Sequence, residues 1–237
     1  MTKKELASLI DHTLLTPNVS SAKIANHCQE ALTYGFASVC VNPIFVPLAA
    51  SALAGSTVKI CTVIGFPFGA ITTAQKVEES ISAVRDGADE LDMVIDLNAV
   101  VDGRFSAVGS DISEVVKAAK NAGREINKNI IVKVIIETCY FDDKTIENCC
   151  LCAKKAGADF VKTSTGYATP VGIDGKTLPN GASEHHIQLM RKTVGSDMGV
   201  KASGGIRSAR IALTMIEAGA TRIGTSSGIN ILDTWDE

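Results

Sequence analysis

Strand-like and helical segments alternate along the whole sequence, and this alternation limits the folds open to the chain. Runs rich in apolar residues, mostly Val and Ile, lie near residues 9–12, 36–41, 59–65, 90–96, 130–137, 160–164, 200–203 and 222–225. Amphipathic stretches such as 73–86, 106–125 and 208–217 lie between them. Eight strands that are each followed by a helix are typical of a parallel sheet covered by helices. The pattern therefore predicts the α/β class.

The length of 237 residues fits either two small domains or one α/β barrel, which often has about 250 residues. No shift of composition and no linker divides the chain. We therefore expect a single (β/α)8 TIM barrel domain over residues 1–237, with a short extra helix at the N-terminus.

A short repeat marks every second predicted strand. Gly-Ala-Asp, or a looser variant, recurs where a helix ends and a strand begins, at residues 35–37, 87–89, 157–159 and 219–221. Five residues beyond each glycine stand Cys40, Asp92, Lys162 and Gly224. Because each layer inside such a barrel takes four side chains from alternate strands, we expect these residues to form one ring around the axis. Branched aliphatic residues fill an ordinary layer, so an acid and an amine here indicate a site.

Two lysines lie where predicted strands end and their loops begin. Lys162 and Lys201 each follow apolar residues and precede small ones. Lysine is depleted in strands and is seldom buried unless paired. Two neighbouring ammonium groups disfavour the charged form, which releases an amine that attacks carbonyl groups. Two separate salt bridges at strand edges would also explain these lysines, and the local sequence leaves that alternative open.

Glycine and serine dominate the loops after the last two predicted strands, at residues 202–206 and 224–228. In this fold, phosphate commonly binds the loops that follow strands 7 and 8. Glycines let backbone N–H groups approach an anion, and hydroxyl groups add donors. Ordinary tight turns are the alternative, but two such loops at the expected places favour a phosphate site.

The composition argues against several kinds of partner. The chain has 23 Lys and Arg against 26 Asp and Glu and a net charge of −3, so we expect no nucleic-acid partner. No apolar run approaches the roughly 18 residues of a membrane span, and the first residues lack the apolar stretch of a signal peptide. We therefore expect a cytoplasmic protein that has no membrane partner. The odd number of cysteines, seven, fits reduced thiols.

The cysteines and histidines do not have the spacing of a metal site. On a helix, Cys149 and Cys152 share a face while Cys150 points elsewhere, and no histidine is near in sequence. The adjacent His185 and His186 diverge on a helix. We expect the three cysteines to be small buried residues, the two histidines to lie on a solvated helix face, and the protein to need no metal and no cofactor.

Taken together, these features resemble the deoxyribose-phosphate aldolase family over nearly the whole chain. The resemblance rests on seven motifs in order, at residues 10–15, 39–43, 90–95, 132–138, 160–166, 200–206 and 222–227. It implies a class I aldolase on a (β/α)8 barrel that cleaves 2-deoxyribose 5-phosphate reversibly to glyceraldehyde 3-phosphate and acetaldehyde. The implied partners are phosphosugar and aldehyde substrates, and we expect a homo-oligomer, either a dimer or a tetramer.

The resemblance also implies roles for individual residues. Lys162 would form the Schiff base, Lys201 would assist it, and Asp92 would give and take protons. The implied phosphate contacts are Gly166, Gly204, Gly205, Gly224, Ser226 and Ser227. The expected supporting groups are Asp11, Thr13, Cys40 and Lys133.

One segment departs from the family pattern. From Tyr167 to Ala182 the chain is several residues longer than we expect for the family, and we expect this segment, which contains Lys176, to lie over the mouth of the site. Three alternatives stay open: another Schiff-base phosphosugar aldolase of the transaldolase-like type, a phosphosugar isomerase or synthase with Asp92 as base, and a phosphosugar-binding barrel without catalysis. The joint presence of Asp92, Lys162 and Lys201 disfavours the last.

Overall fold

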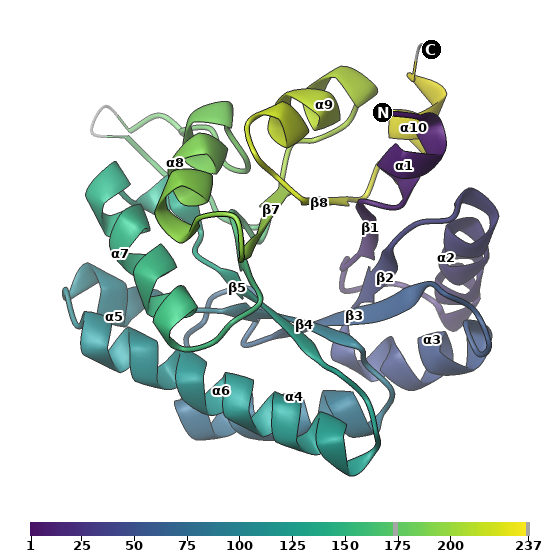
Figure 1. Cartoon of the computed structure of the whole chain (residues 1–237), viewed down its shortest axis with the longest axis horizontal. Helices are drawn as coiled ribbons and strands as arrows, with labels where there is room; N and C mark the ends of the chain where they lie inside the picture. Colours follow the sequence, from purple (N-terminus) through teal and green to yellow (C-terminus); the bar gives the residue numbers. More distant parts are fainter. Residues whose placement is uncertain (173–174, 236–237) are drawn as a thin grey trace.

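Eight parallel strands close into a barrel in chain order in the computed structural model, which describes residues 1–172 and 175–235 (Figure 1). Each strand pairs with the next, and the last pairs with the first. The strands are β1 (Ile10–Leu14), β2 (Ser38–Val41), β3 (Lys59–Ile64), β4 (Glu90–Val94), β5 (Ile131–Ile135), β6 (Phe160–Lys162), β7 (Gly199–Ser203) and β8 (Arg222–Thr225). The predicted barrel is confirmed.

The helices surround the barrel, and α1 precedes the first strand as predicted. They are α1 (Lys3–Ala7), α2 (Ser21–Tyr34), α3 (Val46–Ala52), α4 (Thr73–Arg85), α5 (Leu97–Val101), α6 (Phe105–Glu125), α7 (Asp143–Lys155), α8 (Glu184–Val194), α9 (Ala209–Glu217) and α10 (Gly228–Asp233), with 3-10 turns η1 (Pro43–Phe45) and η2 (Thr138–Tyr140). Capping hydroxyls start several of them: Ser20 accepts the N–H of Lys23 before α2, and Thr72 forms a capping box with Gln75 at α4. Within the described chain, no helix is both long and apolar enough to cross a membrane.

Some strands are shorter than predicted, and β5 shows why. The apolar run continues through Ile136, but Glu137 adopts a left-handed backbone with φ 58°, which extended pairing does not permit. The strand therefore ends at Ile135, and η2 follows. This turn directs the chain after β5 towards the loop that follows β6.

Apolar side chains pack in two separate regions. The larger region lies between the strands and the helices, and it includes Val39, Leu91 and Val132. The smaller region is made of Leu15, Cys40, Cys61 and Val63, with Phe66 against it. Because alternate residues of a strand face opposite sides, Cys40 and Cys61 point into the barrel while their neighbours point outward. The apolar part of the interior thus belongs to β2 and β3, and the opposite side of the barrel is left to polar groups.

Candidate active site

Lys162 and Lys201 lie side by side on neighbouring strands. Lys162 is the last residue of β6, and its register partner on β7 is Lys201. Both amines donate hydrogen bonds to Oδ2 of Asp92 on β4, at 2.6 Å from Lys162 and 2.7 Å from Lys201. The structure thus brings together the three residues that the sequence placed in one site. A carboxylate lies between the two amines, and it favours their charged forms. The expectation that the charge of Lys201 alone frees Lys162 is therefore incomplete.

Asp92 is the centre of this arrangement. Its other oxygen, Oδ1, accepts a hydrogen bond from Lys133 on β5 at 2.9 Å, and the thiol of Cys61 donates to the same oxygen at 3.3 Å. Burial would raise the pKa of Asp92, but the three ammonium groups around it hold that pKa well below its usual range. Asp92 is consequently a carboxylate at all pH values at which the protein would work.

The ion pairs continue across the barrel to β1 and β8. Asp11 accepts hydrogen bonds from Lys201 and, at 2.6 Å, from Arg222. Arg222 also donates to Glu90 at 2.9 Å, and Glu90 pairs with Lys133 at 2.6 Å. These side chains form one connected network, which we call the charge cluster. Its members are Asp11, Glu90, Asp92, Lys133, Lys162, Lys201 and Arg222.

The charge cluster holds four cationic side chains against three carboxylates, which leaves one positive charge in excess. An unbalanced charge in the interior is costly, so the cluster favours the release of one proton. Burial lowers the pKa values of Lys133 and Lys201, but the neighbouring carboxylates more than offset it and raise both above the usual value. These two lysines therefore keep their protons.

A cavity of about 320 Å³ opens beside the ends of β6, β7 and β8. Within the charge cluster, Lys162 is the member that lines it. The side chain of Lys162 is 5 % exposed, whereas those of Lys133 and Lys201 are 0 % exposed. A small molecule in the cavity can therefore touch the amine of Lys162 but not the other two.

The predicted phosphate loops border the same cavity. Five of the six predicted residues line it: Gly166, Gly204, Gly205, Gly224 and Ser226. Gly166 and Gly205 have φ values of 85° and 78°, which favour glycine. Among the described residues, no acceptor takes the backbone N–H of Gly166, Gly205 or Ser226. These donors are available to an anion.

Ser227 lies apart from the other predicted phosphate contacts. It is not among the residues that line the cavity, and its N–H donates to the hydroxyl of Thr225 at 2.9 Å. The hydrogen bond within its own turn explains why the Ser-Ser motif supplies one serine to the cavity instead of two.

Arg207 lines the cavity but is not among the residues predicted from the sequence. Its side chain is exposed, and it directly follows the Gly204-Gly205-Ile206 turn. That adjacency was the available signal, since a cation beside a glycine-rich anion loop adds long-range attraction. The predicted phosphate loops thus have a cationic side chain beside their neutral donors.

The predicted supporting residues divide into two groups. Thr13 lines the cavity, whereas Asp11, Cys40 and Lys133 are fully buried beneath it. The neighbouring side chain of Cys61 lowers the pKa of the Cys40 thiol despite its burial.

Three further members of the interior, Glu90, Cys61 and Arg222, were not among the predicted residues. Glu90 and Asp92 are two positions apart on β4, so they share the inner face. Strand alternation was therefore the signal that could have identified Glu90.

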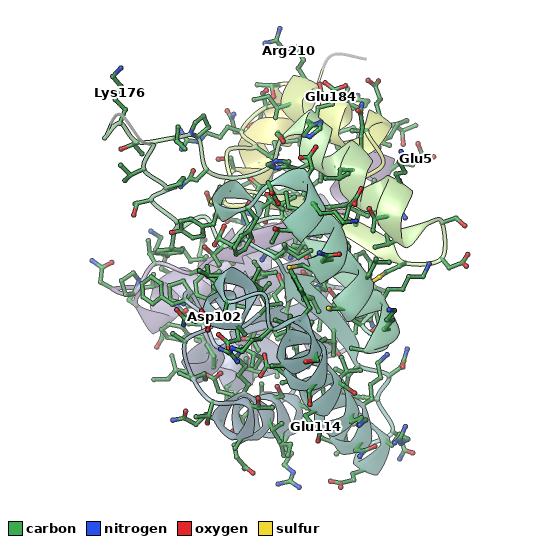
Figure 2. All side chains as sticks on the ribbon, turned by 90° about the vertical axis from the view of Figure 1, so that its left-hand side faces the viewer. Glu5, Asp102, Glu114, Lys176, Glu184 and Arg210 are labelled. Atoms are coloured by element: carbon green, nitrogen blue, oxygen red, sulfur yellow. The ribbon has the colours of Figure 1, made fainter. Side chains whose placement is uncertain are left out.

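The long segment after β6 borders the cavity through Tyr167. Apart from Tyr167, the described residues of this segment do not line it. The segment forms a hairpin with an antiparallel bridge between Val171 and Thr177, and Figure 2 shows Lys176 at its outer end, pointing away from the barrel. Gly181 packs on Gly204, where a β-carbon on Gly204 would lie 2.7 Å from the Gly181 Cα. The predicted position over the mouth thus stays a prediction, which Tyr167 alone supports among the described residues; residues 173 and 174 lie outside the described part.

Two histidines come together with an acid that sequence spacing did not connect to them. His12 Nε2 lies 2.8 Å from a Glu30 oxygen, and the ring of His27 stacks on that of His12 at 3.9 Å with 17° between the planes. Stacked rings direct their lone pairs along nearly parallel lines, whereas the ligands of one ion must converge. The geometry therefore suits a packed pair, in which burial lowers the pKa of both imidazoles.

The remaining cysteines and histidines largely follow their predicted environments. Cys149 and Cys150 are buried, whereas Cys152 is partly buried, and its thiol donates to the carbonyl oxygen of Phe105 at 3.4 Å. His185 is exposed and pairs with Asp143 at 2.8 Å, as a solvated helix face requires. His186 is partly buried, so the predicted solvated face holds for His185 alone.

The geometry of the site agrees with comparisons of the whole sequence. A family model described as DeoC/LacD family aldolase matches residues 6–234. The chain belongs to this family. It is therefore an aldolase, an enzyme of the aldehyde-lyase class.

Relatives of high identity cover nearly the full length. Deoxyribose-phosphate aldolase of Caldanaerobacter subterraneus subsp. tengcongensis is 50 % identical over 240 residues, which cover 99 % of this chain and 97 % of the relative. Deoxyribose-phosphate aldolase of Carboxydothermus hydrogenoformans is 51 % identical over 228 residues, which cover 96 % and 94 %.

Solved structures agree. A putative deoxyribose-phosphate aldolase from Coccidioides immitis superposes with a TM-score of 0.87 at 38 % identity, covering 98 % of this chain and 86 % of the other. Deoxyribose phosphate aldolase from Aeropyrum pernix, described as having a unique tetrameric structure, gives 0.86 at 36 % identity, with 98 % and 91 % covered.

Proposed function

We propose that this aldolase cleaves 2-deoxy-D-ribose 5-phosphate reversibly to D-glyceraldehyde 3-phosphate and acetaldehyde, through a Schiff base on Lys162, in the catabolism of deoxyribose. The observation that carries the proposal is the position of Lys162. It is the lysine of the charge cluster that reaches the cavity, and its amine lies 2.6 Å from Asp92. The names of the relatives support the choice of substrate.

The charge cluster supplies the reactive amine. A nucleophilic lysine must be neutral, and the excess positive charge of the cluster favours the loss of one proton. Lys133 and Lys201 hold their protons between carboxylates and do not reach the cavity. Lys162 does reach the cavity, so its amine is the one that a substrate carbonyl can meet.

The reaction then follows from the chemistry of an imine. The amine of Lys162 adds to the aldehyde carbon of the open-chain sugar, and loss of water leaves a protonated imine. A base removes the proton of the hydroxyl on the third carbon, and the bond between the second and third carbons breaks. The electron pair of that bond passes into the imine, which becomes an enamine, and glyceraldehyde 3-phosphate departs. Protonation of the enamine and hydrolysis release acetaldehyde and restore Lys162.

Asp92 and Lys201 are the proposed proton-transfer pair. They are hydrogen-bonded to each other at 2.7 Å, and both are fully buried beneath the cavity. A proton from the substrate therefore reaches them through a water beside Lys162 or through Lys162 itself. The proton-transfer role of Asp92 needs a fixed carboxylate, and the ion pairs around it supply that.

The phosphate end of the substrate would bind the glycine and serine loops. The free N–H groups of Gly166, Gly205 and Ser226 and the guanidinium of Arg207 line one cavity with Lys162. Binding of this remote group fixes the reacting carbons beside the amine. The same arrangement would serve another Schiff-base phosphosugar aldolase of the transaldolase-like type, which is the second candidate.

Borohydride reduction with acetaldehyde tests the mechanism. Reduction of the imine should add a stable ethyl group to Lys162, which peptide mass spectrometry locates. Lys162→Ala should abolish labelling and turnover, and Lys162→Arg should do no better because guanidinium stays charged. Labelling of Lys133 or Lys201 instead would reverse the assignment. Cleavage rates on deoxyribose 5-phosphate and on ketose phosphates then separate the two candidate aldolases.

A homo-oligomer, a dimer or a tetramer, is also proposed. The Aeropyrum pernix relative is described as tetrameric, and this chain is similar to it over 98 % of its length. Light scattering coupled to size-exclusion chromatography measures the mass directly, and a monomer at micromolar concentration would refute the proposal.

A further inference from the structure

Glu137 combines a strained backbone with a buried carboxylate beside the site. Its φ and ψ are 58° and 59°, a left-handed conformation that is unfavourable for a residue other than glycine. Among described residues other than glycine, only Asn127 also has a positive φ. Glu137 is 1 % exposed. Such strain persists only where the surrounding contacts impose it, so the contacts of Glu137 indicate the role of this residue.

The carboxylate of Glu137 accepts hydrogen bonds from the loop that follows Lys162. It accepts the N–H of Thr165 at 3.1 Å and 3.2 Å, and it also accepts the hydroxyl of Thr165. That hydroxyl oxygen in turn accepts the N–H of Tyr167 at 3.0 Å. One buried carboxylate therefore fixes the residues on both sides of Gly166.

Gly166 is the part of this loop that an anion would use. It lines the cavity with a φ of 85°, and its N–H has no acceptor among the described residues. A glycine at such a φ is free to move unless its neighbours are held. Because Thr165 and Tyr167 are both tied to Glu137, the direction of the Gly166 N–H is set from outside the cavity.

We propose that Glu137 is a positioning residue that acts through Thr165 to hold Gly166 in the conformation that binds the substrate phosphate, and so determines the preference for phosphorylated sugars. The inference rests on the proposed function. Glu137 itself does not line the cavity, so it makes no contact with the substrate.

The protonation state of Glu137 adds a second, independent readout. Burial raises the pKa of Glu137, while the hydrogen bonds from Thr165 and the charge of Lys162 oppose that rise. Below this pKa the carboxyl group is protonated at one oxygen, which then donates, and part of its hydrogen bonding with Thr165 is lost. The other titratable group against it is Cys139 on η2, 3.9 Å away, whose pKa of about 12 keeps it a neutral thiol. Phosphate affinity should therefore fall as the pH drops through a pKa above that of an ordinary glutamate.

The test compares Glu137→Gln with the wild-type enzyme. Glutamine keeps the shape but replaces one acceptor oxygen by a donor. The ratio of kcat/KM for deoxyribose 5-phosphate to that for deoxyribose should fall roughly 10-fold to 100-fold, through KM, as expected for charge-assisted hydrogen bonds. Calorimetry with inorganic phosphate should show weaker binding and no loss on acidification beyond that of phosphate itself. Acetaldehyde and borohydride should label Lys162 no more slowly than in the wild type.

Two further variants keep the test decisive. Thr165→Val removes the hydroxyl that Glu137 holds, so it should lower the same ratio, and the two changes together should have less than the sum of their separate effects. Cys139→Ala removes the other group in contact with Glu137 and should leave the ratio unchanged. If Glu137→Gln does not fold, Thr165→Val and its affinity for inorganic phosphate decide the question.

Three results would overturn the proposal. A wild-type ratio in folded Glu137→Gln or Thr165→Val would show that the loop keeps its conformation without the contact between Glu137 and Thr165. An equal loss for both sugars, with slower labelling, would mean that Glu137 acts on Lys162 instead. A Glu137→Gln protein whose phosphate affinity declines on acidification as steeply as that of the wild type would assign the titration to another group. Failure of wild-type labelling would instead remove the proposed Schiff-base function.

Discussion

Replacing Gly205 by valine tests the proposed phosphate site, and the chain contains a matched control. Gly205 has φ +78°, and a β-carbon there would meet no heavy atom within 4 Å. Gly157 has φ +79°, and a β-carbon there would also meet no atom. Gly157 precedes β6 and therefore lies at the opposite end of the barrel from the cavity. The two substitutions impose the same backbone strain in different places.

The magnitude has two parts. Left-handed backbone costs an L-residue about 1–2 kcal/mol, so both variants should lose at least that much stability, by similar amounts. Only at Gly205 does the new side chain enter the cavity, next to an N–H that has no acceptor among the described residues. Loss of one hydrogen bond to a charged group costs about 1.5–3 kcal/mol, or roughly 10-fold to 150-fold in binding.

The assay is the ratio of kcat/KM for deoxyribose 5-phosphate to that for unphosphorylated deoxyribose, with urea unfolding as the measure of stability. Gly205→Val should lower the ratio, whereas Gly157→Val should lose stability and keep the ratio. A wild-type ratio in folded Gly205→Val would place the phosphate elsewhere. An equal fall in both variants would mean that strain, and not the lost anion contact, is responsible.

Four other predictions follow from the described contacts. Lys201→Leu leaves three cations against three carboxylates, so the cluster loses its excess positive charge and imine formation should move to higher pH; an unchanged profile with a lower rate would limit Lys201 to proton transfer. Arg207→Leu should lower kcat/KM for the phosphorylated sugar by about 2-fold to 5-fold at low salt, and added salt should reduce the difference. EDTA should leave kcat unchanged because the imine itself withdraws the electrons, and a loss that zinc restores would contradict this. Burial lowers the pKa of His27 from 6.5 to about 4, so folding stability that is present above pH 6.5 should be lost on acidification. Between pH 7 and pH 4, the free energy of unfolding of the wild type should fall by roughly 3 kcal/mol more than that of His27→Asn, as measured by urea unfolding.

The barrel and the centre of the site were predictable because both follow from periodicity. Alternating segments indicated the strands, and a repeat at every second strand placed Asp92 and Lys162 at one level of the barrel. The two residues lie 70 positions apart in sequence and 2.6 Å apart in the structure. On β5, the register partner of Asp92 is Lys133 and that of Lys162 is Ile135, so the contact also depends on both side chains pointing into the barrel.

Other features depend on side-chain conformation and were not predictable. Arg222 reaches across the barrel to Asp11 and Glu90, which no local pattern shows. The course of the segment after Tyr167 depends on how Gly181 packs against Gly204, so its length alone does not tell that, of its described residues, Tyr167 lines the cavity and the others do not. The left-handed conformation of Glu137 is equally hidden, because a glutamate after an apolar strand gives no sign of it.

The span of the charge cluster also bears on how the chain reaches its native state. Asp11 and Arg222 are 211 positions apart and join the first strand to the last. While the protein is being made on the ribosome, β8 emerges last, and until then Asp11 and Glu90 lack the guanidinium that they share. A chain truncated before β8 would have to bury these carboxylates without it, which is strongly unfavourable. Because α1 and α10 are neighbours, a circular permutant that joins the two ends would keep every ion pair (Figure 1). A nascent chain therefore completes the charge cluster around Lys162 only when the barrel closes.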